Sequence, residues 1–461
     1  MAFKGHGMYH VRPNDFYSET PPPRIIGTES ECSIQNPNNT PIHDYISRKS
    51  LRNSGLNTVG GFLDNGFKVY VDVGFLEIDT PECLGPKQAA AADYAAILLL
   101  GKIVEQSGKP HDGLYRFTGT MIAEDIKTNG YHENLMIPRS IAENEQLDTV
   151  FASHLASRVW SFAGGVQDNF CLSQKIKGII EPSIERHNLS RRTANKPMAM
   201  IPPNDEDTIG NTNDWARLEI RFADTGFSLT GRYLSLAASS LAVRLLEHQD
   251  LINAERIIDY SFKKQVVSAN VFSRDLSFKK TVPTLEGKSI SALDYQEVLA
   301  SEAQALSYKI ELPDDEVDAI GLWIDVIDRL RQADLSIGEY AGLLSVLDFA
   351  PRHKYLTTRF PEELIHSGNN DVITANLLWD RVSPIGGGMK YWRAVGSKYV
   401  SEDDVAQVLT TPPRTRASIR ANIIKSDGLS KLEAANWSCI YRNGFKINFD
   451  SPYNSYSPPL C

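Results

Sequence analysis

The sequence predicts an α+β fold in which an antiparallel β-sheet carries helices packed on one face, followed by a small C-terminal domain. Segments in which apolar and polar residues alternate, as in β-strands, come early in the chain, and stretches with helical periodicity follow. Strands followed by helix-rich segments are typical of this arrangement. With 461 residues, the chain can bury a large core.

The expected strands include RIIGTESECSI (24–34), GFKVYVDVG (66–74), YHENLMI (131–137) and ARLEIRFAD (216–224). Alternation in the second and fourth segments places polar groups on one face: Lys68, Tyr70 and Asp72, and Arg217, Glu219 and Arg221. A long helix is expected over 86–108, because this segment has proline in its first turn and glycine at its end. Further helices are expected over 141–163, 229–250 and much of 290–350.

Carboxylates are crowded in the segment KVYVDVGFLEIDTPEC (68–83), which contains Asp72, Glu77, Asp79 and Glu82. Like charges repel, and a buried carboxylate is costly unless a partner compensates its charge. These groups therefore either form the solvated face of a half-exposed sheet or surround a cation. Acids on other expected strands strengthen the second interpretation: Glu29, Glu31, Glu133 and Glu219. Such oxygen ligands suit a hard cation such as Mg²⁺, which shares its shell with phosphate oxygens.

The overall composition excludes several classes of protein. The net charge of −9 gives no support to nucleic-acid binding, and no apolar run reaches the roughly 18 residues of a membrane span. Five scattered cysteines without a CxxC pair argue against a disulfide scaffold or a zinc site, and for the cytoplasm.

Basic residues gather between 175 and 196, in KIKGIIEPSIERHNLSRRTANK. Six lysines and arginines stand against two glutamates there, so this segment is a candidate docking site for an acidic, flexible polypeptide. The alternative is a basic loop without a partner. The expected boundaries are a flexible extension over 1–23, a main domain over 24–365 and a small C-terminal domain over 370–461, after the polar stretch IHSGNNDV.

Seven segments occur in the order and approximate spacing of the Pup ligase and Pup deamidase family, which the chain therefore resembles: RIIGTESE, FLDNGFKVYVDVG, EIDTPEC, YHENLMI, CLSQKI, TPPRTRASIR and NW. The resemblance implies a curved, glutamine-synthetase-like sheet and a carboxylate–amine ligase that uses ATP and Mg²⁺, with a C-terminal domain that contributes to the nucleotide site. The sequence departs from the family pattern at PPNDEDTIG, where Asn204 replaces an arginine, and the stretch between Asp72 and Glu77 is one residue short.

The resemblance also implies roles for individual residues. It makes Asp72 the catalytic aspartate, and Glu29, Tyr70 and Glu77 residues of the metal site. Lys68 stands at an ATP-contacting arginine, and Thr80 and Trp437 at nucleotide-binding positions. Glu219 matches a metal ligand of glutamine synthetases, and Glu31 and Glu133 are added as metal ligands from the strand pattern. Arg217 and Arg221 are candidates to steady the transferred phosphoryl group, with Arg217 assigned to the cofactor and Arg221 to catalysis.

The expected function is an ATP-dependent ligase that phosphorylates a glutamate side chain, that of the C-terminal glutamate of a Pup-like modifier, and joins it to a lysine of a protein substrate. Only about thirty residues separate GTESE from FLDNG, which resembles the ligase branch more than the deamidase branch. Three alternatives remain: a deamidase or depupylase with Asp72 as nucleophile, a divergent ligase with a small-molecule substrate, and a non-catalytic ATP-binding scaffold.

Overall fold

The computed structural model describes residues 11–35, 40–72, 74–116, 120–122, 125–127, 130–166, 169–186, 197–203, 205–224, 226–365, 367–427, 432–449 and 451–453. Its main sheet has the strand order β13–β14–β15–β10–β1–β5–β4–β3–β2, and β6 and β7 also pair with β1. All of these pairs are antiparallel except β13–β14. The strands are β1 (Ile25–Gln35), β2 (Thr58–Val59), β3 (Phe62–Leu63), β4 (Lys68–Asp72), β5 (Phe75–Asp79), β6 (Cys83–Leu84), β7 (Gly113–Tyr115), β10 (Tyr131–Pro138), β13 (Ile184–Glu185), β14 (Ala199–Met200) and β15 (Trp215–Ile220).

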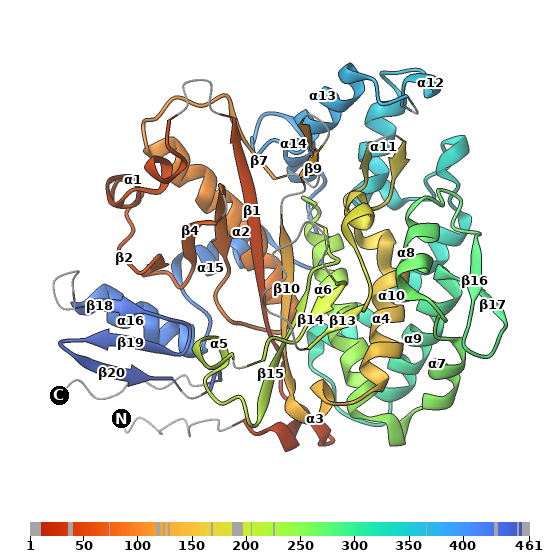
Figure 1. Ribbon diagram of the computed structural model, residues 1–461, viewed down its shortest axis with the longest axis horizontal. Coiled ribbons are helices and arrows are strands. Elements are labelled where there is room, and N and C mark those ends of the chain that lie inside the picture. Colours follow the sequence, from red (N-terminus) through yellow and green to blue (C-terminus); the bar gives the residue numbers. More distant parts are fainter. Residues whose placement is uncertain are drawn as a thin grey trace.

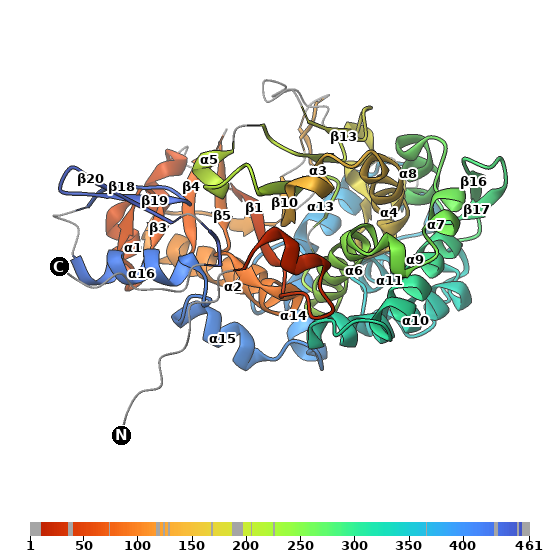
Figure 2. The ribbon, with the colours of Figure 1, turned by 90° about the horizontal axis from the view of Figure 1, so that it is seen from below.

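Long helices pack against one face of this sheet, which confirms the predicted fold class. Figure 2 shows α2, α14 and α15 on one side of β4, β5, β1 and β10, and α5 on the other side. The main helices of this layer are α2 (Gly85–Gln106), α6 (Leu229–Glu247), α9 (Ala292–Ser307), α10 (Asp314–Gln332), α14 (Gly387–Val395) and α15 (Glu402–Thr410). Shorter helices complete the fold: α1 (Arg48–Asn53), α3 (Arg139–Ala142), α4 (Ala152–Ser157), α5 (Glu206–Ile209), α7 (Ala254–Tyr260), α8 (Gln265–Ser273), α11 (Phe349–Thr357), α12 (Glu362–Ile365) and α13 (Asn370–Trp379).

Helix α2 fits closely under the sheet because its first half is rich in alanine. Small side chains allow close approach, and Ala89 to Ala92 are fully buried. Asp93 interrupts this apolar run and is also fully buried, where Arg116 donates two hydrogen bonds of 3.0 Å to its carboxylate. The hydroxyl of Thr28 on β1 donates to the same carboxylate at 3.0 Å. The buried charge is thus compensated, and it ties the helix to the central strand.

Two segments differ from the sequence prediction. The helix expected over 141–163 is broken into α3, a π-helical turn (Leu147–Phe151), α4 and a short 3-10 turn (Arg158–Ser161). The expected flexible extension is the second segment, of which the structure describes residues 11–23. Its Phe16 is fully buried in a small cluster with Trp215 and Tyr453, so apolar contacts hold this part of the chain against the sheet.

The C-terminal strands form a small sheet of their own beside the main sheet (Figure 1). This C-terminal module consists of α16 (Arg416–Asp427), β18 (Leu432–Ala435), β19 (Cys439–Arg442) and β20 (Phe445–Asn448). Its apolar side chains form a separate cluster with Val59 and Phe62 of the main sheet. Buried apolar residues between 372 and 408, by contrast, belong to the main core. The division of the chain at residue 370 stays a prediction.

A buried ion pair fastens this module to the main sheet. Glu82, which follows β5, accepts hydrogen bonds from Arg416 Nε and Arg420 Nη2, both at 2.7 Å. Both arginines are almost fully buried, and they hold the pKa of Glu82 at about 2, against the effect of burial, which raises it. Spacing of four residues on α16 brings both guanidinium groups to one carboxylate.

No helix in the described part of the chain is long and apolar enough to cross a membrane.

Replacing Glu82 with glutamine should loosen the C-terminal module, because it leaves two buried guanidinium groups without a counter-charge. Breaking a buried ion pair costs about 3–5 kcal/mol of the free energy of unfolding. Urea unfolding and hydrogen exchange across α16 and β18–β20 measure the loss. Asp325→Asn, which breaks an exposed pair with Arg329, is the matched control and should cost less than about 1 kcal/mol. Equal losses in the two variants would contradict this role of Glu82.

Candidate active site

The face of the main sheet opposite α2 carries polar side chains from five adjacent strands. On the central strand β1, Glu29 and Glu31 alternate with Thr28, Ser30 and Cys32, which are buried toward the helices. Pairing places Glu31 opposite Glu77, and Glu77 opposite Tyr70. The same face receives Lys68 and Asp72 from β4, Asp79 from β5, His132 and Asn134 from β10, and Arg217 and Glu219 from β15. Residues more than 180 positions apart in the chain thus meet on one surface.

Three carboxylates converge where β1, β4 and β5 lie side by side. One oxygen from each of Glu31, Asp72 and Glu77 lies within 4.8 Å of the others. The Tyr70 hydroxyl donates a 2.6 Å hydrogen bond to Glu77, and one oxygen of Asp79 is buried without a hydrogen-bond partner in the described residues. This all-oxygen donor set fits Mg²⁺, and crowded carboxylates are the kind of group that a divalent cation compensates.

The surroundings raise the pKa values of two buried acids on β5, Glu77 and Asp79. Burial, followed by the charges of Asp79 and Glu29, raises the pKa of Glu77 to about 10. Burial and the charge of Glu29 raise the pKa of Asp79 to about 8, although Lys68 acts in the opposite direction. Burial and mutual repulsion therefore favour the protonated forms of both acids, and a bound cation would act in the opposite direction.

A second group of acids on the same face is compensated by the protein. Burial disfavours the ionised form of Glu29, but hydrogen bonds and charge from His132 (2.9 Å) and Arg217, with Asn134 (2.9 Å), hold its pKa at about 2. Glu219 lies 3.0 Å from Arg217 and 2.6 Å from Arg221, and these cations, with His132, lower its pKa despite burial. This half of the face is ionised and pre-organised without any added ion.

Lys68 and Trp437 meet at the edge of the site next to the C-terminal module. The Lys68 ammonium lies 3.6 Å from Asp79, 4.1 Å from the Tyr70 ring centre and 5.7 Å from that of Trp437. Trp437 packs edge-to-face on Phe62, with ring centres 4.9 Å apart. The buried ion pair of Glu82 with Arg416 and Arg420 therefore holds the C-terminal module where the side chain of Trp437 can reach β4.

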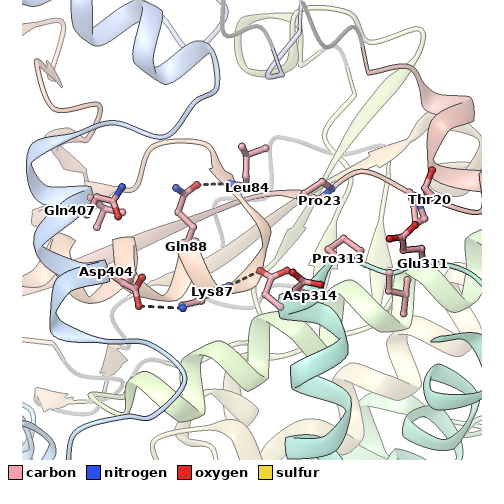
Figure 3. A pocket seen from close by; sticks show the side chains of 15 residues that line it. Thr20, Pro23, Leu84, Lys87, Gln88, Glu311, Pro313, Asp314, Asp404 and Gln407 are labelled. Atoms are coloured by element: carbon pink, nitrogen blue, oxygen red, sulfur yellow. Dashed lines mark hydrogen bonds and ion pairs between the residues drawn. The ribbon is translucent and has the colours of Figure 1, made fainter. Parts of the chain in front are cut away.

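A separate groove of about 630 Å³ lies among helices, between Thr20–Pro23, the start of α2, the start of α10 and α15 (Figure 3). Two of its acids have structural partners. Asp404 pairs with Lys87 at 3.5 Å, and Asp315 accepts from the backbone nitrogen of Lys87 at 3.2 Å, at the start of α2. None of the carboxylates of the strand face lines this groove.

Comparison with known proteins decides the family. The family model described as "Pup-ligase protein" matches residues 8–441 of the chain. The chain belongs to this family. A Pup–protein ligase of Acidimicrobium ferrooxidans is 24% identical over 423 residues, which cover 87% of this chain and 89% of that protein. A Pup deamidase/depupylase of Mycolicibacterium smegmatis is also 24% identical, over 82% of this chain and 74% of that protein.

Two solved structures have the same fold as this Pup-ligase family member. The complex between the prokaryotic ubiquitin-like protein Pup and its ligase PafA matches with a TM-score of 0.77 and 18% identity, over 94% of this chain and 90% of that one. The Pup ligase PafA in complex with ADP matches with a TM-score of 0.73 and 17% identity, over 90% and 92% of the two chains. The resemblance first inferred from short motifs is therefore confirmed.

Two residues assigned from the sequence lie elsewhere than expected. Glu133 is buried on the helix side of β10 because it alternates with His132 and Asn134, and it pairs with Arg158 at 2.8 Å. Its assignment as a metal ligand is therefore wrong in this structure. Thr80 is buried beyond the end of β5, where its hydroxyl accepts a 2.8 Å hydrogen bond from the backbone nitrogen of Thr28. A contact between Thr80 and a nucleotide stays a prediction.

The basic segment 175–196 is only partly described. The Lys175 ammonium is buried and donates to the Tyr131 carbonyl at 3.0 Å, and Arg186 forms a bidentate pair with Asp148 at 2.6 and 2.8 Å. These two cations are thus already engaged by other groups of the protein. Arg191, Arg192 and Lys196 lie outside the described residues, as does the side chain of Lys177.

The family member also uses polar residues that the sequence analysis left without a role. Asp79, Asn134 and Asp205 all contact the site, through Lys68, Glu29 and Arg217 respectively. Alternation contains the signal for the first two, because each stands two residues beyond a site residue on its own strand. Asp205 follows no strand period, so only the folded structure reveals its contact.

Without a bound cation, the protein should become less stable as the pH rises from about 4.5 to about 8. Over this interval the unfolded chain releases protons that Glu77 and Asp79 keep in the folded state, so the folded state binds more protons and the free energy of unfolding falls. Mg²⁺ should oppose this fall because it stabilises ionised carboxylates.

Urea unfolding in EDTA and in MgCl₂ across this pH range tests the trend, and Glu77→Gln should weaken it. A Mg²⁺ effect that is equal at about pH 5 and at about pH 8 would contradict the assignment of these acids to a cation site.

Proposed function

We propose that this chain is an ATP- and Mg²⁺-dependent ligase that joins the side-chain carboxylate of a C-terminal glutamate, on a Pup-like modifier, to a lysine amine of a protein substrate. One observation carries the proposal: in a member of the Pup-ligase family, a cluster of carboxylates and pre-organised arginines share one sheet face with an aromatic side chain at its edge. Its relatives include a Pup–protein ligase, and a Pup ligase in complex with ADP shares its fold, which supports the same reaction.

The reaction needs two steps because joining a carboxylate to an amine in water is uphill. A carboxylate oxygen of the modifier first attacks the γ-phosphorus of ATP, forming an acyl phosphate and releasing ADP. The lysine nitrogen then attacks the acyl carbon, loses a proton and expels phosphate, leaving an isopeptide bond. Bound Mg²⁺ supplies charge neutralisation for the triphosphate during the first step.

The chain's own residues divide this work. Glu29, Glu31, Tyr70, Glu77 and Glu219 would hold the metal. Asp72 lies at the exposed end of β4, where an incoming lysine can approach, and we assign it as the base that accepts the ammonium proton. Arg221 and Arg217 are already oriented by Glu219, so they can meet the charge of the transferred phosphoryl group without reorganising.

Lys68 and Trp437 are proposed to bind the nucleotide, with Trp437 flanking the base and Lys68 contacting phosphate. A lysine at this position keeps the charge but lacks the two-pronged geometry of an arginine. We place the activity in the cytoplasm, a proposal supported by the free thiols of Cys32, Cys83, Cys171 and Cys439.

Hydrolysis is the second candidate, because a deamidase/depupylase matches this chain at the same identity as a ligase does. In that reaction Asp72 would attack the amide carbon of a glutamine-ended modifier or of the conjugate. The acidic partner is common to both candidates, so the chemistry at residue 72 separates them.

Incubation with ATP, Mg²⁺, a lysine-bearing protein and either a glutamate-ended or a glutamine-ended modifier distinguishes the two reactions by intact mass. Conjugates formed only from the glutamate-ended modifier identify a ligase, and loss of ammonia from the glutamine-ended one identifies a deamidase. Neither product, with ATP bound and unchanged, would contradict both and favour a scaffold.

Asp72→Asn should lower the rate of transfer to lysine by about 10²–10⁴-fold, the usual loss for a general base, and leave ATP affinity nearly unchanged. Glu31→Gln should instead weaken Mg·ATP binding. Single-turnover kinetics and equilibrium nucleotide binding separate the two effects. Full activity of the Asp72 variant would exclude its role as base.

A further inference from the structure

Helix α5 has contacts at both ends of the proposed nucleotide site. It lies between β15 and the strands of the C-terminal module (Figure 1). The helix belongs to PPNDEDTIG (202–210), the segment that departs from the family pattern, and the reaction proposed above gives it no role. Two acids of this segment, Asp205 and Asp207, nevertheless contact Arg217 and the turn that carries Trp437.

At the phosphate end, Asp205 orients Arg217. Its carboxylate accepts a 2.7 Å hydrogen bond from Arg217 Nε, and its side chain is only 13% exposed. The Nη1 atom of the same guanidinium donates to Asn134 at 2.9 Å and lies 3.0 Å from Glu219. Contacts on two edges of the guanidinium plane therefore fix its direction.

At the base end, Asp207 holds the turn that carries Trp437. Its carbonyl accepts from the backbone nitrogen of Ser438 at 3.1 Å, and its carboxylate accepts from the side chain of Asn436 at 3.3 Å. On the other side of this turn, Arg420 donates to the Trp437 carbonyl at 2.9 Å. The tryptophan is thus held from two directions.

We propose that Asp205 and Asp207 are positioning residues that keep Arg217 and Trp437 at a fixed separation, so that one nucleotide meets both at once. This inference rests on the proposed function. Groups held in place before binding reduce the entropy lost on association, and Asp205, the N-cap of α5, is separated from Asp207 by only one position.

Binding of Mg·ATP and of Mg·tripolyphosphate, which lacks the base, tests the two ends separately. Asp205→Ala should weaken both ligands about tenfold, the effect of a lost hydrogen bond to a charged group. Asp207→Ala should weaken ATP about fivefold and leave tripolyphosphate unchanged. In steady-state kinetics both variants should raise the KM for ATP more than they lower kcat, which a general loss of folded protein would not do.

Asp148→Ala is the matched control, since it removes a bidentate pair with Arg186 outside the site and should leave both affinities unchanged. Thermal unfolding shows whether each variant stays folded, and Asp205→Asn, which removes only the charge, replaces Asp205→Ala if that variant melts earlier than the control. Wild-type ATP affinity in the Asp205 and Asp207 variants would overturn the positioning role alone. Failure of the wild-type protein to bind Mg·ATP would overturn the proposed function as well.

Discussion

The alternation of side chains along the central strand β1 is the constraint on which the rest of the structure depends. Residues 28, 30 and 32 point into the core beneath α2, so Glu29 and Glu31 must point away from it. A shift of the strand by one residue would bury both carboxylates among alanines and expose the core residues. Thr28 and Ser30 oppose such a shift because both donate to the buried carboxylate of Asp93. One strand register therefore fixes which side chains of β1 enter the core and which face the site.

The polar face of the sheet has two halves that differ in the charges surrounding their acids. Around Glu29 and Glu219, arginines supply counter-charge and His132 lies within hydrogen-bonding distance of Glu29, so the ionised forms of both acids are favoured before any metal binds. Around Glu31, Asp72 and Glu77 the carboxylates crowd together, and burial raises the pKa of Glu77. Crowding of acids at this location destabilises the folded protein, and a bound divalent ion would offset the repulsion. The free-energy cost of crowding these acids therefore falls at the place where the metal ion is expected to bind.

The C-terminal module shows how a distant part of the chain is recruited to this face. The paired arginines of α16 are buried against Glu82, which follows the site strand β5 by three residues. Movement of the module would expose an ion pair that is stable only with both partners in place. The module, including Trp437, therefore behaves as part of the sheet edge even though its apolar cluster is separate from the main core.

The sequence by itself determined the α+β class and the alternation along β1, β4, β10 and β15, because a period of two residues depends only on local backbone geometry. It also indicated the family through motifs such as FLDNGFKVYVDVG. The sequence also shows that Glu133 alternates with His132 and Asn134. Only the pairing of β10 with β1 decides which of these residues face the site. Partners distant in sequence were decided only by the tertiary structure: Asp205 with Arg217, and Glu82 with Arg416 and Arg420. Ion pairs of this kind follow from how whole elements pack, and no local period encodes them.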